Sequence, residues 1–183
     1  MMLIYIDPTI MSGTLREALD LYNQFSDEEI LEALRRVHLI DDQDNDKKEN
    51  KNVFVNLNTK VDENGQNFSS GERQLLVITK AILNRSKVII FDESTSAVDY
   101  KTDELIQRTI REEFGQSTIF TIAHRLRTVI DYDLIAVMDN GNIVELASPS
   151  ELLSQTTSRF FKMCKATGSQ EFSTLRKIAN ESD

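Results

Sequence analysis

The sequence predicts a mixed α/β fold built around a parallel β-sheet, and two observations lead to this prediction. Two apolar runs, Val88–Phe91 and Ser117–Ala123, have the length and composition of strands that are buried on both faces. A helical stretch at about 101–114 lies between them, and strand–helix–strand over this distance is typical of a βαβ unit with parallel strands. We therefore expect both strands to belong to one parallel sheet.

The residues before this unit predict one short strand and three helices. The apolar run Leu3–Ile6 has the character of a strand, and the segment 41–51, with eight charges in eleven positions, is expected to be a solvated loop. Each helix starts at a capping box, in which Ser or Thr is followed three residues later by Glu. The second helix is expected over 27–39 and the third up to about residue 84. The capping boxes are Thr14 with Glu17, Ser26 with Glu29, and Ser69 with Glu72.

The C-terminal part is predicted to hold a β-hairpin followed by helices. Two apolar segments, 134–138 and 142–146, flank Asn140-Gly141, a strong signal for a tight hairpin turn. Ser148 followed by Pro149 predicts the start of a helix, and Gly168 is expected to end the next one. The apolar spacing in 169–183 is weak, so that both helix and disorder stay open for this tail.

The composition excludes several functional classes. With 21 basic and 30 acidic residues the net charge is −9, and since there is no basic stripe, no nucleic-acid partner is expected. No apolar run approaches the roughly 18 residues of a membrane helix. The apolar start has no basic flank and meets Asp7-Pro8, which makes it a poor signal peptide. A single cysteine, Cys164, excludes an internal disulfide and a cysteine-rich zinc site.

Polar residues stand where the two predicted strands end. Asp92 and Glu93 follow the first strand, and His124 follows the second. Ligands of parallel sheets bind beyond the carboxyl ends of the strands, where two carboxylates can hold a divalent cation and activate a water. Acidic residues also end many strands in plain contact with solvent, and a lone histidine is more often structural than catalytic. Two such strand ends, one crossover apart, favour the functional interpretation.

The segment Phe68–Gln74 supplies a third feature. A capping box alone accounts for Ser69 and Glu72. The same geometry, a serine, a glycine and backbone N–H groups at a helix N-terminus, also suits an anion such as phosphate. The capping interpretation and the phosphate interpretation are therefore compatible with each other.

Taken in this order, these segments resemble the nucleotide-binding domain of ABC transporters, and most closely the second one of the multidrug-resistance-associated C subfamily. The likeness covers about residues 3–155. It implies a P-loop NTPase-like three-layer core with an incomplete parallel sheet, an α-helical subdomain, and a C-terminal β-hairpin plus helices. The matching segments are NFSSGERQLL (signature), Val88–Glu93 (Walker B), Ser96–Asp99 (D-loop), Thr121–Leu126 (H-loop), Asp7–Thr9, Ser12–Thr14, SDEEILEALRRVHL and TDELIQRTIREEF.

The family's phosphate loop, G-x-x-x-x-G-K-[ST], is missing from the sequence. None of the six glycines precedes Lys-Ser or Lys-Thr at that spacing. The chain therefore looks like an N-terminally truncated domain that is inactive alone. We expect a partial domain over 1–167, with the helical subdomain at about 12–84 and the rest of the core at about 85–167, followed by a tail at 168–183.

The resemblance implies ATP and Mg²⁺ as cofactors and gives three residues catalytic or metal-binding roles. Asp92 would hold Mg²⁺ through water. Glu93 would be the general base that polarises the attacking water, and His124 would contact the γ-phosphate.

Further residues are implied to act across a head-to-tail dimer with a second ABC nucleotide-binding domain. The signature residues Ser69, Ser70, Gly71 and Glu72 face the other domain, and Ser69 and Gly71 would reach the γ-phosphate that its phosphate loop holds. Asp99 would link the two domains. The transmembrane domains of a transporter are the other implied partner, which places the chain at the cytoplasmic face of a membrane.

Three positions depart from the family pattern. Ile6 replaces the glutamine that precedes Asp-Pro in the family and cannot coordinate Mg²⁺ or water. Ser70 and Glu72 replace the second and fourth residues of Ser-Gly-Gly-Gln in the signature. A carboxylate near a γ-phosphate is repulsive and competes for the helix N-terminus. We therefore expect weak hydrolysis at the composite site that uses this signature.

Two other functions remain open at this point. The chain could be a non-hydrolysing regulatory half that pairs with another ABC domain through the signature and D-loop. It could also be an ABC-type ATPase outside transport, although the TIAHRL segment and the acidic charge argue against this. Tight ATP binding by the isolated chain would contradict the missing-loop argument.

Overall fold

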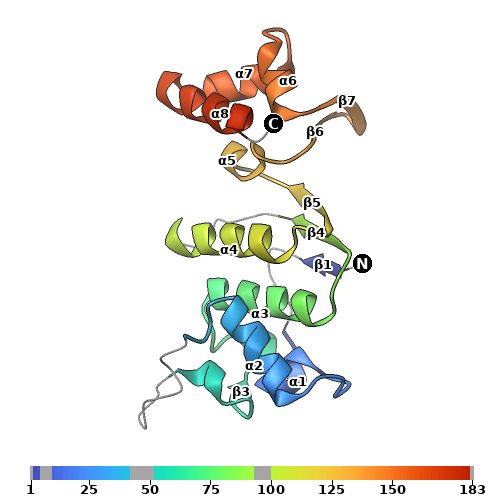
Figure 1. Cartoon of the computed structure of the whole chain (residues 1–183), viewed down its shortest axis with the longest axis vertical. Coiled ribbons are helices and arrows are strands. Elements are labelled where there is room, and N and C mark those ends of the chain that lie inside the picture. Colours follow the sequence, from blue (N-terminus) through green and yellow to red (C-terminus); the bar gives the residue numbers. More distant parts are fainter. Residues whose placement is uncertain (1, 5–9, 42–51, 93–99, 182–183) are drawn as a thin grey trace. The chain divides into compact units, whose positions relative to one another are not determined.

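A parallel sheet organises the first of the two units into which the chain divides, Met1–Ile122 and Ala123–Asp183 (Figure 1). The computed structural model describes residues 2–4, 10–41, 52–92 and 100–181. The strand order is β1–β4–β5, both pairings are parallel, and α4 joins β4 to β5, so that the predicted βαβ unit is confirmed. These elements are β1 (Met2–Ile4), β4 (Val88–Asp92), α4 (Tyr100–Glu113) and β5 (Thr118–Ile122).

The strands β4 and β5 are less buried than the sequence predicts. Ile89 is fully buried against the helices, whereas Phe120 and Ile122 are each 57% exposed. The register pairs Ile90 with Phe120 and Asp92 with Ile122, so these four residues share the face opposite Ile89. The prediction of strands buried on both faces is therefore wrong, because the described helices of this unit cover the Ile89 face.

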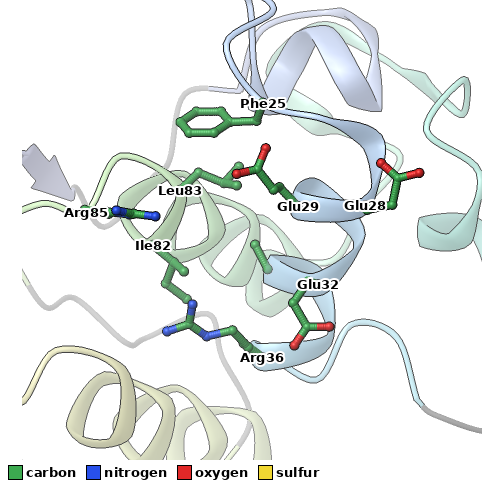
Figure 2. Close-up of a pocket in the computed structure, with 9 residues that line it drawn as sticks. Phe25, Glu28, Glu29, Glu32, Arg36, Ile82, Leu83 and Arg85 are labelled. Carbon is green, nitrogen blue, oxygen red and sulfur yellow. The ribbon is translucent and has the colours of Figure 1, made fainter.

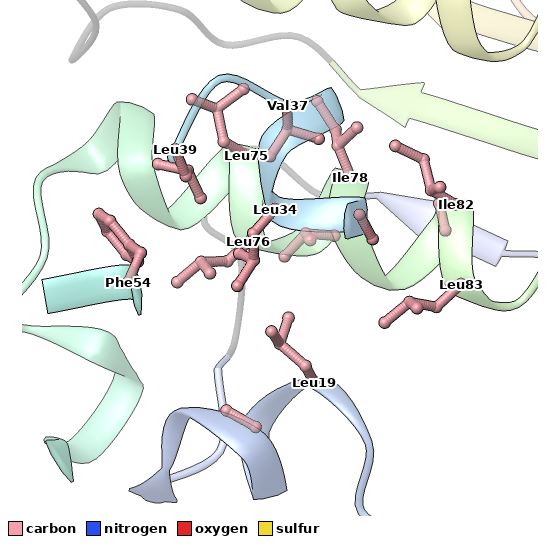
Figure 3. Packing of buried hydrophobic residues seen from close by; sticks show 14 of the residues in the cluster. Leu19, Leu34, Val37, Leu39, Phe54, Leu75, Leu76, Ile78, Ile82 and Leu83 are labelled. Atoms are coloured by element: carbon pink, nitrogen blue, oxygen red, sulfur yellow. The ribbon is translucent and has the colours of Figure 1, made fainter. Parts of the chain in front are cut away.

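Three capped helices pack beside the sheet, and all three predicted capping boxes are confirmed. The second helix ends at Arg36 rather than at Leu39, because His38 takes a positive φ of 59° that no α-helix continues. Leu34 of this helix and Val37, which caps its C-terminus, lie in the main core with Leu75 and Leu76 of the third helix (Figure 3). The helices are α1 (Leu15–Leu19), α2 (Asp27–Arg36) and α3 (Ser70–Leu83).

Short elements that the sequence does not predict surround these helices. Gly13 pairs with Val61 in a two-stranded antiparallel ladder. Strands and turns of two or three residues carry too little periodicity to be read from sequence. They are β2 (Gly13–Thr14), η2 (Val53–Val55), β3 (Lys60–Val61) and η3 (Glu63–Gly65).

The second unit is a β-hairpin packed on helices around its own core. The hairpin turns at Asn140 and Gly141, which take positive φ values of 47° and 79°, as the predicted tight turn requires. The tail that the sequence left open forms a helix. The elements are α5 (Leu126–Val129), β6 (Ile135–Asp139), β7 (Asn142–Ala147), α6 (Pro149–Ser154), α7 (Arg159–Ala166) and α8 (Ser169–Glu181).

Two carboxylates fasten the elements of this second unit together. Glu145 of β7 accepts hydrogen bonds from the backbone N–H groups of Arg159 and Phe160, at 2.6 and 3.1 Å, and so caps α7. Burial alone would raise the pKa of Glu145, but these donors lower it below its ordinary value. Arg127 of α5 donates two hydrogen bonds, of 2.5 and 2.6 Å, to Glu171 of α8, and this pairing lowers the pKa of that carboxyl.

Candidate functional site

The first turn of α3 holds four of the predicted site residues, Ser69, Ser70, Gly71 and Glu72. The Ser69 hydroxyl accepts a hydrogen bond from the Glu72 backbone N–H at 3.2 Å. In return, the Ser69 backbone N–H donates to the Glu72 carboxylate at 2.7 Å. This capping box uses two of the donors at the helix N-terminus and leaves the N–H groups of Ser70 and Gly71 outside it. The carboxylate thus sits on the helix N-terminus, where a phosphate would otherwise be attracted.

Gly71 is buried, and the reason is its contact with α4. A Cβ atom placed on Gly71 would lie 2.2 Å from the methyl carbon of Thr102, far inside normal van der Waals distance. A glycine at this position therefore lets the first turn of α3 lie directly against α4. The part played by Thr102 has no signal in the sequence, because it depends on how two helices pack.

Aromatic packing holds the residue before this turn. Phe68 is buried and stacks on Phe54, with ring centroids 5.3 Å apart. The guanidinium of Arg73 donates to the Phe68 carbonyl oxygen at 3.1 Å, which fixes the backbone at the entry to α3. The turn is consequently anchored on both sides, by Phe68 at its start and by the buried helix that follows it.

Asp92 is the last residue of β4 and is half-buried at the carboxyl end of the sheet, as predicted. It lies on the same face as Ile122, with which it is paired in register. Glu93, Asp99 and Ile6 lie outside the described residues. Among the residues that the structure describes, no group of three His, Cys, Asp or Glu side chains could hold a metal ion. Of the metal-binding residues predicted from the sequence, the described part of the chain thus contains Asp92, without a full set of metal ligands around it.

His124 belongs to the second unit, two residues after the end of β5, and its side chain is exposed. The structure therefore places the first turn of α3 and Asp92 in one unit, and His124 in the other. Within the first unit, Ser69–Glu72 and Asp92 come from α3 and β4, two elements that pack in the same core.

A groove of about 320 Å³ lies elsewhere in the first unit, between α2 and the end of α3 (Figure 2). Its apolar lining includes Phe25 and Ile82, and charged side chains of both signs surround it. None of the site residues predicted from the sequence lines this groove. Its full lining is Phe25, Glu28, Glu29, Glu32, Ala33, Arg36, Ile82, Leu83 and Arg85.

Comparisons with known proteins agree with the resemblance seen in the sequence. Residues 9–96 match the family described as ABC transporter. The chain is 43% identical over 185 residues to a pleiotropic ABC efflux transporter of multiple drugs from Candida glabrata, an alignment that covers 96% of this chain and 11% of that protein.

Two further relatives agree with this match. An ABC transporter ATP-binding protein/permease of Saccharomyces cerevisiae is 44% identical over 184 residues, which cover 96% of this chain and 11% of that protein. ATP-binding cassette sub-family C member 2 of Rattus norvegicus is 48% identical over 162 residues, which cover 88% of this chain and 10% of that protein. The chain thus spans about a tenth of the length of these relatives.

Proposed function

Since the chain belongs to the ABC transporter family and is related to its C-subfamily members, we propose that it forms the part of an ATP-binding domain that follows the phosphate loop, in a transporter driven by ATP hydrolysis. The observation that carries this proposal is the pairing, within one unit, of a capped helix N-terminus at Ser69–Glu72 and a parallel strand that ends at Asp92. The first suits a phosphate and the second a divalent cation.

The proposed roles follow the chemistry of the side chains. Asp92 holds Mg²⁺ through water, Glu93 polarises the attacking water, and His124 contacts the γ-phosphate. The cation, when bound, neutralises the negative charge that spreads over the transferred phosphoryl group. The described residues fit this cofactor in part, because Asp92 stands at the correct strand end while the phosphate loop is missing from the sequence.

The signature turn is proposed to act in a composite site with a second ABC nucleotide-binding domain. The Ser69 hydroxyl accepts a bond within its own helix but keeps its hydrogen, so that it can still donate to a phosphate held by the other domain. Asp99 is proposed to link the two domains. The transmembrane domains of the transporter are the other proposed partner, and the chain is proposed to work at the cytoplasmic face of the membrane.

The part before Walker B is proposed to be the helical subdomain, at about 12–84, and the part at about 85–167 to be the rest of the three-layer core. No helix among the described residues is long and apolar enough to cross a membrane. Any membrane-spanning part of such a transporter is therefore proposed to come from outside the described helices.

A chimeric transporter tests the proposed function. The chain replaces the matched residues of the Candida glabrata relative, and ATPase activity is measured in the purified chimera. We expect magnesium-dependent activity that Glu93→Gln lowers at least tenfold while nucleotide binding is kept. A chimera that reaches the membrane and binds nucleotide, but shows no ATPase activity even with Glu93 in place, would contradict the proposal.

Glu72 is proposed to weaken the composite site, because its carboxylate accepts from the Ser69 N–H at 2.7 Å and faces the same N-terminus that a phosphate needs. In the chimera, Glu72→Gln should raise the ATPase rate or the affinity for nucleotide. Glu29→Gln is the matched control, since Glu29 holds the same position in the capping box of α2. If Glu72→Gln raises neither the ATPase rate nor the affinity for nucleotide, the Glu72 carboxylate does not weaken the composite site. An equal rise with Glu29→Gln would contradict its role in the same way.

A regulatory role that pairs with another ABC domain without hydrolysis is the second candidate. The observation that favours it is the missing phosphate loop in the sequence. It predicts that Glu93→Gln leaves the ATPase activity of the chimera unchanged, whereas changes at Ser69 still alter it.

A further inference from the structure

We propose that Asn140, at the tip of the β6–β7 hairpin, is a site of spontaneous covalent modification, in which the backbone nitrogen of Gly141 displaces the side-chain amide as ammonia. Hydrolysis of the cyclic product by water leaves aspartate or isoaspartate at this position. The proposal goes beyond the proposed function and does not depend on it, because the reacting residues lie in the second unit and the reaction needs no nucleotide.

The sequence contains two dipeptides of the kind that this reaction needs. Two of the six glycines follow an asparagine, in Asn64-Gly65 and Asn140-Gly141. An asparagine side chain reaches the backbone nitrogen of the next residue, and glycine hinders that approach least because it has no Cβ atom. Both asparagines take positive φ values, 54° and 47°, and both glycines do as well, 66° and 79°. The two sites are therefore alike in sequence and local conformation, and their surroundings distinguish them.

The Gly65 nitrogen is held in place by its surroundings. Its N–H donates to the Asp62 carbonyl oxygen at 2.8 Å, and the residue is buried. A Cβ atom placed on Gly65 would lie 3.2 Å from side-chain carbons of both Ile10 and Arg73, so the backbone has little room to turn. An attack by this nitrogen would have to break a hydrogen bond and move packed side chains, and we expect Asn64 to react slowly.

The Gly141 nitrogen stands in open surroundings instead. Asn140 and Gly141 are both exposed, and a Cβ atom placed on Gly141 would meet nothing within 4 Å beyond its chain neighbours. Within the described part of the chain, no hydrogen bond holds the Gly141 N–H. This nitrogen can therefore lose its proton and turn toward the Asn140 side chain without breaking a contact.

A neighbouring side chain activates the same peptide group. Asn142 Nδ2 donates a hydrogen bond of 3.2 Å to the main-chain carbonyl oxygen of Asn140, which shares its peptide group with the Gly141 N–H. When the nitrogen loses its proton, the negative charge spreads onto that oxygen, and a hydrogen bond to a charged group favours the charged form. The Asn142 side chain thus assists the deprotonation that starts the reaction.

The reaction balances without an oxidant or a reductant. The Gly141 nitrogen gives up its proton and forms a bond to Asn140 Cγ, while the bond between Cγ and Nδ2 breaks and ammonia leaves with the proton. Water then opens the cyclic imide. Cleavage between the nitrogen and Cγ yields aspartate, and cleavage between the nitrogen and the main-chain carbonyl carbon yields isoaspartate, whose backbone runs through the former side chain.

Either product changes how the hairpin tip is held. The register pairs Asp139 with Asn142 across a tight two-residue turn, and isoaspartate adds a backbone carbon that does not fit this turn. Aspartate keeps the backbone but places a second carboxylate beside Asp139, which forms an ion pair of 2.7 Å with Arg159 at the start of α7. We therefore expect faster amide exchange at the hairpin tip in the isoaspartate product than in the aspartate product.

The test ages the full chain at mildly alkaline pH and follows both Asn-Gly peptides by mass spectrometry after proteolysis. In the native chain we expect Asn140 to convert at least tenfold faster than Asn64. In urea, where the surroundings of both sites are lost, the two should convert at similar rates. Enzymatic methylation of isoaspartate then separates the two products of Asn140.

Two variants test the role of Asn142. Asn142→Ala removes the donor to the Asn140 carbonyl oxygen, and Asn142→Asp keeps the size of the side chain without the donor, so both should slow the conversion of Asn140 at least threefold. Asn84→Ala is the matched control, because it removes a side-chain hydrogen bond to the Lys80 carbonyl oxygen far along the sequence and should leave the rate unchanged. Amide exchange of β6 and β7 shows for each variant that the hairpin is still formed.

Two results would overturn the proposal. The first is a native chain in which Asn140 converts no faster than Asn64, since the open surroundings of Gly141 would then have no effect. The second is an Asn140 whose conversion is slowed by neither Asn142 variant, or is slowed equally by the Asn84 control.

Discussion

Replacing Gly71 with alanine should destabilise α3, although the same change stabilises most helices. At an ordinary position inside a helix, alanine is favoured over glycine by about 1 kcal/mol. At Gly71, however, the new Cβ would lie 2.2 Å from Thr102 Cγ2 and 3.4 Å from Thr102 Cβ. Carbon atoms pack best at roughly 3.5–4.0 Å, and overpacking of this kind typically costs about 1–3 kcal/mol. We expect this steric penalty to exceed the gain in helix propensity, so that α3 loses up to about 2 kcal/mol of stability.

The size of this loss is best read from hydrogen exchange of the buried α3 amides, because the chain has two units and global unfolding need not be two-state. Thr102→Ser removes the methyl carbon but keeps the hydroxyl, so the double variant Gly71→Ala, Thr102→Ser should regain the lost protection. Thr102→Val keeps a methyl at the same branch and should not rescue. If Gly71→Ala alone protects α3 as well as glycine does, or if valine and serine rescue equally, the steric argument is wrong.

Three further predictions concern the second unit. Glu145→Ala should speed amide exchange at the start of α7 by an amount equivalent to about 1 kcal/mol, whereas Glu151→Ala should not. The pKa of Glu145 is lowered in the fold. The stabilisation of α7 by this carboxylate is therefore fully present above about pH 4.3 and is lost as pH falls through the pKa of Glu145 in the folded chain. Amide exchange at the start of α7, measured over an acid titration, checks this. Arg127→Lys should remove the two-point hydrogen bond to Glu171 and make the unit slightly less stable near neutral pH, by less than about 1 kcal/mol. Because the pKa of Glu171 is lowered in the fold, this difference in stability should shrink as pH falls through that lowered pKa. Burial raises the pKa of the Cys164 thiol to about 11, so at pH 8 it should react with iodoacetamide at least roughly a hundredfold more slowly in the native chain than in urea.

The elements with strong local signals could be predicted from the sequence. The three capping boxes start helices after Thr14, Ser26 and Ser69, and the hairpin turns at Asn140-Gly141. Both features could be predicted because each depends on residues within four positions of one another. The βαβ unit also follows from local patterns, since apolar runs and helical periodicity are visible along the chain.

Burial could not be predicted in the same way. Phe120 lies in an apolar run that reads as a core strand, yet the side chain is 57% exposed. An apolar run shows that a surface is suited to burial, but only the tertiary arrangement decides whether a partner covers it. The contact between Gly71 and Thr102 is equally invisible in the sequence, because it joins residues 31 positions apart in two different helices.

Comparison of the three capping boxes shows how far the signature motif alone can indicate a phosphate site. Thr14 with Glu17, Ser26 with Glu29, and Ser69 with Glu72 make the same reciprocal pair of hydrogen bonds, and the bond to the carboxylate is 2.7–2.8 Å long in all of them. Reciprocal capping is therefore a structural device of this fold and cannot by itself mark a phosphate site.

What distinguishes the third box is its second helical position, where Gly71 replaces the Arg16 and Glu28 of the other two. A glycine there keeps a bulky or charged side chain away from the turn and lets the turn lie against α4, whose first residue directly follows Asp99. The functional interpretation thus depends on Gly71 and its helix contact, and the variants at Gly71 and Thr102 examine the feature that separates a phosphate site from an ordinary cap.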